Sequence, residues 1–225
     1  MNNKNKSKDR REEIEFRILE SKGHALRDHE LMEMFLSATH DRDEARVIAK
    51  RLMDSYKGIG RLLGQEMDDL KTTEGVTDST VAVIQGANTL VNRVLREKIE
   101  KGPLIDNWEK LTDYLRVNIG YSERENLKVL FLNKGCYLIG EETYVGSASQ
   151  IPIFIMEIIR KIALKRATSI IISHNQPGGT VKPSERDKAM TKKLASVCDN
   201  AGIELIDHVI VTGEGYYSFK RNRLL

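Results

Sequence analysis

The hydrophobic pattern of the chain changes near residue 100. Before that point apolar residues recur every three or four positions, and after it several form short uninterrupted runs such as Ile170-Ile171-Ile172. The first pattern places apolar side chains on one face of a helix, whereas the second is typical of buried strands. Residues 11–100 are therefore predicted to form an all-helical module, and residues 104–225 a mixed α/β domain.

Helical periodicity, capping residues and glycines set the expected limits of the N-terminal elements. Asp28 and Asp43 are the expected N-caps of two helices, and Gly23 is the expected end of the first. The first ten residues are polar and charged, and we expect a disordered tail there. The predicted helices span about residues 11–21, 28–38, 43–53, 59–63, 67–71 and 78–100.

The segment Lys101-Gly102-Pro103 is the predicted boundary between the two parts. Beyond it, helices are predicted at about 106–117, 152–166 and 184–200. Strands are predicted at about 127–132, 136–139, 142–146, 168–173, 203–211 and 216–219, with a hairpin turn at 133–135. Strands mixed with helices in this order favour an α/β layer architecture.

The segment LKTTEGVT at positions 70–77 is similar to a helix-hairpin-helix turn. In that motif a Gly-apolar-Gly turn exposes backbone N–H groups that bind a DNA phosphate. Here Thr77 stands in place of the second glycine, and its Cβ makes a left-handed backbone costly. Two interpretations stay open: a DNA-binding turn, and a helix connector that only packs the module.

Composition narrows the protein class only slightly. A formal charge of +3 permits contact with nucleic acid but does not argue for it, because acidic residues nearly balance basic ones. The polar N-terminus lacks the apolar region of a signal peptide, and no apolar stretch approaches a membrane span. Without a secretory signal, Cys136 and Cys198 are expected to be reduced. We therefore expect a cytoplasmic protein that does not associate with membranes.

The segment SHNQPGGTVKPSERD at positions 173–187 has the layout of a functional site. His174 ends a predicted strand, Asp187 lies in the first turn of the next helix, and a loop rich in proline and glycine can bring the two together. An imidazole, a carboxylate, a third ligand and an open position for water make a catalytic zinc site. Such a site needs a separate carboxylate to transfer the proton of the water.

These residues resemble a known family of metallopeptidases. The pattern His-x-His-x7-Ser-x2-Asp is that of the JAMM (JAB1/MPN) peptidases, and the bacterial RadC family has the version HNHPSG followed by PSxxD. This chain has HNQPGG at positions 174–179 and PSERD at 183–187. The resemblance to RadC proteins extends to further segments: GHALRDHEL at 23–31, VLFLN at 129–133, DHVIV at 207–211 and YSF at 217–219.

The resemblance implies a fold, an activity and roles for individual residues. The fold would be a JAMM/MPN-like (cytidine-deaminase-like) α/β domain, and the activity zinc-dependent hydrolysis of peptide or isopeptide bonds. His174 and Asp187 would be metal ligands, and Ser184 would stabilise the developing oxyanion. Glu125, or alternatively Glu123, would be the general acid and base. The family name also links these proteins to DNA repair.

Gln176 stands where the family has its second histidine ligand. An amide oxygen is a weaker donor to zinc than an imidazole nitrogen, so Gln176 would be a weak ligand. Gly178 replaces the serine of the family loop. Two hypotheses follow: an active zinc hydrolase, and a non-catalytic DNA- or protein-binding module that has lost its metal. His208 could replace the lost ligand, but we predict that it pairs with the carboxylate of its neighbour Asp207.

Overall fold

The computed structural model describes residues 3–146 and 151–225 and divides into two compact units. We call Met1–Thr89 the helical unit and Leu90–Leu225 the sheet unit. The division falls within the long helix α6 (Asp78–Glu100), so α6 contributes residues to both units. The expected boundary at residues 101–103 comes just after this helix.

The helical unit confirms the predicted all-helical module. It contains α1 (Asn3–Ser21), α2 (Asp28–Leu36), α3 (Arg42–Tyr56), α4 (Ile59–Leu63), α5 (Met67–Leu70) and the first part of α6. The first helix begins at Asn3, where a disordered tail was expected over residues 1–10. The predicted cap Asp43 is wrong: Asp41 caps α3 by accepting the N–H of Glu44 at 3.0 Å. These helices enclose one apolar cluster, formed by Met32, Leu36, Ala45, Ile48, Ala49, Leu52, Leu62, Leu70, Val81 and Ile84.

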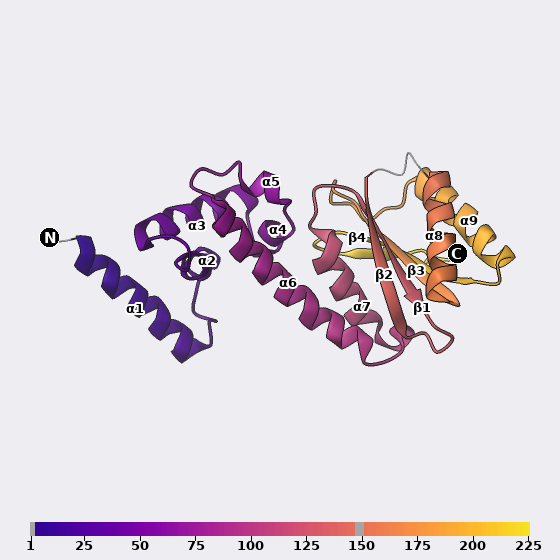
Figure 1. Cartoon of the computed structure of the whole chain (residues 1–225), viewed down its shortest axis with the longest axis horizontal. Helices are drawn as coiled ribbons and strands as arrows, with labels where there is room; N and C mark the ends of the chain where they lie inside the picture. The colour runs from indigo at the N-terminus through magenta and orange to yellow at the C-terminus, as the bar shows by residue number, and fades with distance from the viewer. Residues whose placement is uncertain (1–2, 147–150) are drawn as a thin grey trace. The chain divides into compact units, whose positions relative to one another are not determined.

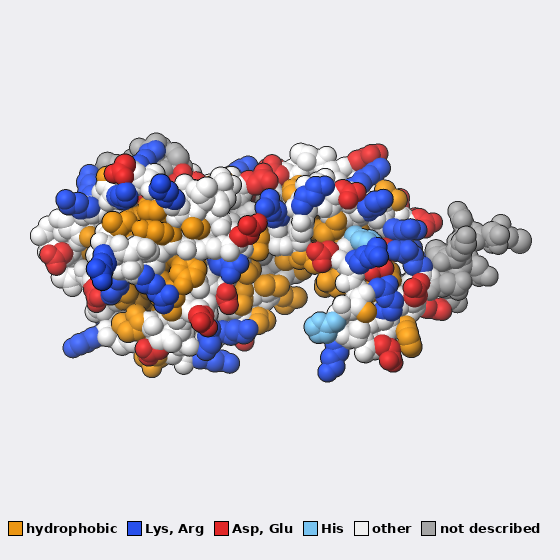
Figure 2. Space-filling view, turned by 180° about the vertical axis from the view of Figure 1, so that it is seen from behind, with side chains coloured by type: hydrophobic (Ala, Val, Ile, Leu, Met, Phe, Trp, Pro, Cys, Tyr) orange, Lys and Arg blue, Asp and Glu red, His pale blue; other side chains and the backbone are white. Residues whose placement is uncertain are grey.

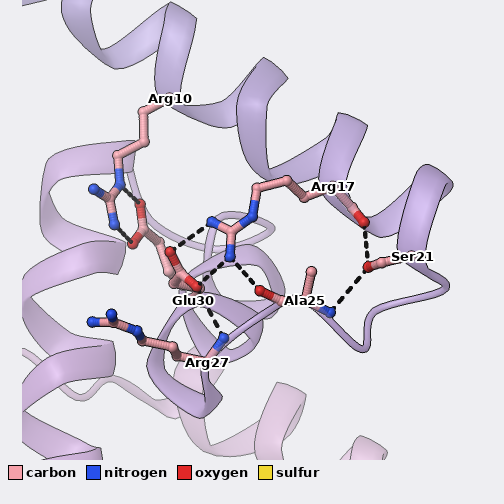
Figure 3. Close-up of polar contacts among 7 residues, drawn as sticks. Arg10, Arg17, Ser21, Ala25, Arg27 and Glu30 are labelled. Carbon is pink, nitrogen blue, oxygen red and sulfur yellow. Dashed lines mark hydrogen bonds and ion pairs between the residues drawn. The ribbon is translucent and has the colours of Figure 1, made fainter.

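Two arginines of α1 fasten this helix to α2 (Figure 3). Arg17 donates to both oxygens of Glu30, with N–O distances of 2.9 and 3.0 Å, and Arg10 pairs with Glu33 in the same way. Glu30 also accepts the N–H of Arg27 at 2.9 Å, so Glu30 holds the start of α2 in place of the expected cap Asp28. The hydrogen bond from Arg17 lowers the pKa of Glu30 to about 2, although partial burial opposes this shift.

The sheet unit confirms the predicted mixed α/β fold. Its helices are the 3-10 helix η1 (Leu104–Asn107), α7 (Trp108–Leu115), the π-helix η2 (Arg116–Gly120), α8 (Ile151–Lys165) and α9 (Glu185–Asn200). Its strands are β1 (Asn126–Leu132), β2 (Leu138–Val145), β3 (Ser169–Asn175), β4 (Glu204–Val211) and β5 (Tyr216–Ser218). In Figure 1, α7 lies against one face of the sheet and α8 and α9 against the other. One strand differs from expectation: β2 is a single strand, where separate strands at 136–139 and 142–146 were predicted.

The five strands have the order β2-β1-β3-β4-β5. Strands β3 and β4 are parallel and are joined through α9, while the other pairs are antiparallel. Along β1 and β3, successive side chains pack alternately into two apolar clusters, one on each face of the sheet. Val129, Phe131, Ile170 and Ile172 face α8 and α9, whereas Leu130, Leu132 and Ile171 face α7. Both faces of the central strands are therefore buried, which explains their uninterrupted apolar runs.

Charges of both signs are mixed on the face of the molecule that Figure 2 shows. Figure 2 shows Lys and Arg side chains interspersed with Asp and Glu on the face in view, together with exposed hydrophobic side chains. This mixture agrees with the small formal charge of +3. Along the described residues, no helix combines the length and apolarity that crossing a lipid bilayer requires.

Candidate metal site

The candidate site forms where β3 ends beside the first turn of α9. His174 is the sixth residue of β3 and is 5% exposed, and it lies opposite Leu127 of β1 and Ile210 of β4. It shares a strand face with Ile172, which packs toward α8 and α9. The apolar strand pattern thus fixes the face on which the imidazole emerges.

Asp187 is held in place by Ser184 at the start of α9. Its Oδ2 atom accepts the N–H of Ser184 at 2.8 Å and the hydroxyl of Ser184 at 2.6 Å. In return, Ser184 Oγ accepts the N–H of Asp187 at 3.1 Å, which completes a capping box. The Ser184 hydroxyl, expected to stabilise an oxyanion, is therefore bonded to the Asp187 carboxylate.

The structure brings His174 and Asp187 together, as their positions in the sequence predict. His174 Nε2 lies 3.5 Å from Asp187 Oδ1, and both side chains are nearly buried. Burial lowers the pKa of His174, while the charge of Asp187 works in the opposite direction. A neutral imidazole beside a carboxylate is not an ion pair. Two ligand atoms of one tetrahedral zinc ion lie about 3.4 Å apart, so the observed separation fits adjacent ligands.

His208 belongs to this site, and sequence reasoning did not find its partners. His174 Nδ1 lies 2.8 Å from His208 Nε2, and His208 Nδ1 lies 2.6 Å from Thr191 Oγ1. The prediction that the His208 side chain pairs with Asp207 is wrong, because Asp207 instead accepts the hydroxyl of Ser218 and two backbone N–H groups. Phe219 stacks on the His208 ring at 4.5 Å.

A register shift in β4 explains why His208 reaches His174. Leu205 lies opposite Ile170, but the next pairs join Asp207 to Ile171 and His208 to Ile172. One extra residue in a strand moves every later side chain to the other face of the sheet. Thr191, four residues after Asp187, lies one helical turn farther along α9. The spacing of Thr191 is visible in the sequence, whereas the shift in β4 is not.

Glu125 lies just before β1 and is half-buried, while the alternative Glu123 is exposed. It is two residues from Leu127, which pairs with His174, so an extended backbone directs it to the same face. Burial raises the pKa of Glu125, the charge of Asp187 raises it further, and Arg186 opposes both effects. Of the two predicted general bases, the structure places Glu125 within electrostatic reach of the site.

Gln176, at the predicted second ligand position, continues the strand geometry beyond β3. Its N–H donates to the carbonyl of Val211 at 3.1 Å, so its side chain emerges on the same face as His174. Its Oε1 atom is buried and has no hydrogen-bond partner among the residues that the structure describes. A buried acceptor without a partner is uncommon, and a bound cation would satisfy it.

Three atoms are available as metal ligands: an imidazole nitrogen of His174, a carboxylate oxygen of Asp187 and the amide oxygen of Gln176. Within residues 3–146 and 151–225, no group of three His, Cys, Asp or Glu side chains is arranged to hold a metal. The donor set fits a divalent ion through two ordinary ligands and one weak ligand. A ligand set of this composition would bind zinc more weakly than two histidines and a carboxylate would.

The helix-hairpin-helix-like turn lies in the helical unit and has its own internal bonds. Gly75 has a φ of +91°, as a tight turn requires, and a Cβ there would lie 2.9 Å from Ile48. The N–H of Thr77 donates to Thr80 Oγ1 at 3.0 Å, and the N–H of Val76 donates to a carbonyl of the turn. These two N–H groups therefore already have partners within the protein.

The five-stranded sheet and the frame of His174, Ser184 and Asp187 define a JAB-like α/β domain. The chain belongs to the RadC-like JAB domain family, whose family model matches residues 105–224. Relatives cover most of the chain. A UPF0758 protein of Ruegeria pomeroyi is 26% identical over 95% of this chain and 96% of its own length. A UPF0758 protein of Fusobacterium nucleatum is 29% identical over 88% and 89% of the two chains. A third, from Burkholderia thailandensis, is 32% identical over 87% of this chain and 75% of its own.

Proposed function

We propose that the sheet unit is a zinc-dependent hydrolase of peptide or isopeptide bonds that binds its metal weakly. The observation that carries this proposal is the 3.5 Å separation between His174 Nε2 and Asp187 Oδ1. A histidine kept neutral by burial beside a fixed carboxylate is a pair of ligands suited to zinc. The buried and unpartnered oxygen of Gln176 supplies a third donor on the same strand face.

His174, Asp187 and Gln176 would hold the ion in this proposal. Zinc, when bound, would lower the pKa of a water molecule and polarise a substrate carbonyl. Ser184 has a positioning role: its N–H and hydroxyl occupy Oδ2 of Asp187 and thereby turn Oδ1 toward His174. This assignment replaces the oxyanion role that the resemblance implied for Ser184.

Glu125 is the proposed general base and acid. Its pKa is raised by burial and by Asp187, which brings it closer to the pH at which a carboxylate can both accept and return a proton. The backbone carbonyl of Glu125 accepts the N–H of Gly146 at 3.0 Å, which fixes the main chain at this position. Glu125 would take the proton of the attacking water and pass it to the leaving amine.

The decisive experiment is metal analysis of protein purified without an affinity tag. We expect zinc in the purified protein or, after loading with zinc, a single site that His174→Ala and Asp187→Asn abolish. Gln176→His should raise zinc affinity because it restores an imidazole donor. His29→Ala, in the helical unit, is the matched control and should leave zinc binding unchanged.

A hydrolysis assay separates the active enzyme from its non-catalytic alternative. Zinc-loaded protein should cleave a mixed peptide or isopeptide library, and Glu125→Gln should abolish cleavage while retaining zinc. In the same assay Glu123→Gln should behave as wild type. If wild type binds no zinc at micromolar concentration and Gln176→His does, the protein is a module that has lost its metal. If neither protein binds zinc, the proposed ligand set is refuted.

A further inference from the structure

Four side chains form a continuous chain of contacts through the site: Thr191, His208, His174 and Asp187. The distances along it are unequal. Thr191 Oγ1 lies 2.6 Å from His208 Nδ1, and His208 Nε2 lies 2.8 Å from His174 Nδ1. The last contact, from His174 Nε2 to Asp187 Oδ1, is 3.5 Å. The first two distances are those of hydrogen bonds, whereas the third is longer than a hydrogen bond between these atom types.

The hydrogen bond between Thr191 and His208 has a fixed direction. Thr191 Oγ1 also lies 2.6 Å from the backbone carbonyl oxygen of Asp187, one helical turn earlier. A carbonyl oxygen has no proton to give, so the single hydroxyl proton of Thr191 must lie on this bond. Thr191 Oγ1 can then only accept from His208, which places the proton of His208 on Nδ1.

The position of the proton on His174 follows from the same rule. A neutral imidazole protonated at Nδ1 presents a lone pair at Nε2, so His208 Nε2 accepts from His174. His174 must therefore carry its proton on Nδ1, and its Nε2 lone pair faces Asp187 Oδ1. The 3.5 Å separation agrees with two acceptors that have no proton between them. His208 is fully buried and His174 nearly so, which limits exchange of these protons with water.

We propose that Thr191, acting through His208, is a positioning residue that sets the tautomer of His174 and keeps its Nε2 lone pair available as a ligand. The importance of this tautomer for metal binding rests on the function proposed above. The arrangement of the protons itself does not, because it is inferred only from the contacts of Thr191, His208 and His174. A histidine ligand commonly takes its orientation from the partner of its other ring nitrogen. Here that partner is a second histidine, itself oriented by a helix hydroxyl.

Without the Thr191 hydroxyl, the protons of His208 and His174 could take the opposite arrangement. His208 could then carry its proton on Nε2 and donate to His174 Nδ1. The proton of His174 would move to Nε2 and block the ligand atom. Thr191→Val has a similar shape but no hydroxyl, whereas Thr191→Ser retains the hydroxyl. This pair separates the hydrogen bond from the packing of the side chain.

Nitrogen-15 NMR of the imidazole rings in metal-free protein tests the tautomers directly. The chain has five histidines, and His24, His29 and His40 lie in the helical unit, so the signals can be assigned. Wild type and Thr191→Ser should show His174 and His208 protonated at Nδ1. Thr191→Val should shift His174 toward the Nε2-protonated form. Fluorescence of Trp108, the single tryptophan, reports whether each variant retains a folded sheet unit.

Zinc affinity supplies the second readout. Thr191→Val should weaken zinc binding about tenfold, and Thr191→Ser should leave it within about twofold of wild type. A wild-type His174 protonated at Nε2, or an unchanged tautomer in folded Thr191→Val, would overturn this inference. If Thr191→Val does not fold, the wild-type spectrum still decides. A protein with the expected tautomers that binds no zinc would refute the proposed function and leave the Thr191–His208 assignment intact.

Discussion

The side-chain oxygen of Asn175 accepts the backbone N–H of Asn126 at 2.6 Å and joins the end of β3 to the start of β1. The Asn175 amide nitrogen donates to the carbonyls of Ser122 and Arg124, each at 2.9 Å. Asn175 is fully buried and follows His174 directly. One side chain therefore fixes the backbone on both sides of Glu125 relative to the strand that carries His174.

Asn175→Ala should destabilise the sheet unit by about 2–3 kcal/mol. The substitution removes three hydrogen bonds and leaves the buried N–H of Asn126 and the carbonyl of Ser122 to find new partners, whereas the carbonyl of Arg124 keeps the amide of Asn126 as a donor at 3.0 Å. Urea unfolding followed by Trp108 fluorescence measures this effect, because Trp108 lies in the sheet unit. Asn200→Ala, an exposed position at the end of α9, is the control and should change stability by less than about 0.5 kcal/mol. Equal stability of the two variants would contradict the role given to Asn175.

Gly75→Ala should destabilise the helical unit by about 2 kcal/mol or more. The φ of +91° is costly for a residue with a Cβ, and the new methyl group would lie 2.9 Å from a side-chain carbon of Ile48. Circular dichroism of the helices during urea unfolding, compared with Trp108 fluorescence, distinguishes the two units. Contact between this turn and DNA stays a prediction, and the same variant, if folded, tests it through salt-dependent retention on DNA.

Gly86 provides the matched glycine control for that experiment. It lies inside α6, and a Cβ there would meet no atom within 4 Å. Gly86→Ala should stabilise the helical unit by about 0.5–1 kcal/mol, because alanine favours helix interiors. If both substitutions changed stability in the same direction, the conformational argument for Gly75 would fail.

The helical unit should lose stability in acid through Glu30. The pKa of Glu30 is about 2 in the folded state and ordinarily 4.5, mainly because Arg17 donates two hydrogen bonds to it (Figure 3). A lowered folded-state pKa gives stability that is fully present above the ordinary value and is lost as the pH falls toward the folded value. We expect the free energy of unfolding to fall by about 1–3 kcal/mol between pH 5 and pH 2. The difference between the two pKa values of Glu30 sets the upper limit of this loss.

Glu30→Gln should remove that part of the pH dependence and lower stability at pH 7. Thermal unfolding followed by circular dichroism at several pH values measures both effects. Glu20→Gln, at an exposed position of α1, should retain the wild-type pH profile. A Glu30→Gln profile parallel to that of wild type would show that other carboxylates cause the acid sensitivity.

Sequence periodicity predicted most elements because burial acts on local patterns. The long helix α6 and the buried strands β1 and β3 have unmistakable apolar spacing. The predicted cap Asp43 is wrong because two acidic residues compete for this role and only Asp41 precedes the first helical turn. The pattern predicts two strands in place of β2 because Gly140 and Glu141 interrupt its apolar residues, whereas pairing with β1 holds the strand together.

The sequence predicted the residues of the site better than their hydrogen bonds. His174 lies at the end of β3, Ser184 and Asp187 lie at the start of α9, and one short loop joins the two elements, so their meeting depends on local geometry. His208 and Asn175 act through partners on other elements, at separations of 34 and 49 residues. The position of His208 also depends on the register shift of β4, which adds one residue without a marker in the sequence. Such long-range relationships require the folded sheet.

A buried charge pair lies on the opposite face of the sheet, toward α7. Lys128 Nζ is 3.2 Å from Glu141 Oε1, and its side chain is 3% exposed. Glu141 Oε2 accepts the hydroxyl of Tyr114 at 2.6 Å, and Arg96 lies 3.7 Å from Oε1. Burial lowers the pKa of Lys128, and the charge of Glu141 opposes that shift. Each charge is therefore tolerated because of the other.

The two single substitutions should together lower the free energy of unfolding by more than the double substitution does. Glu141→Gln leaves Lys128 buried without its counter-charge and should destabilise the sheet unit by about 3 kcal/mol, while Lys128→Met should cost about 2 kcal/mol because Arg96 still faces Glu141. The double variant should be more stable than the sum of these losses implies, by at least about 1 kcal/mol. Urea unfolding followed by Trp108 fluorescence gives the cycle, and the exposed pair Lys188–Glu185, 2.6 Å apart on α9, should show no measurable coupling. Additive losses at Lys128 and Glu141 would mean that these two charges are stabilised separately by their other neighbours.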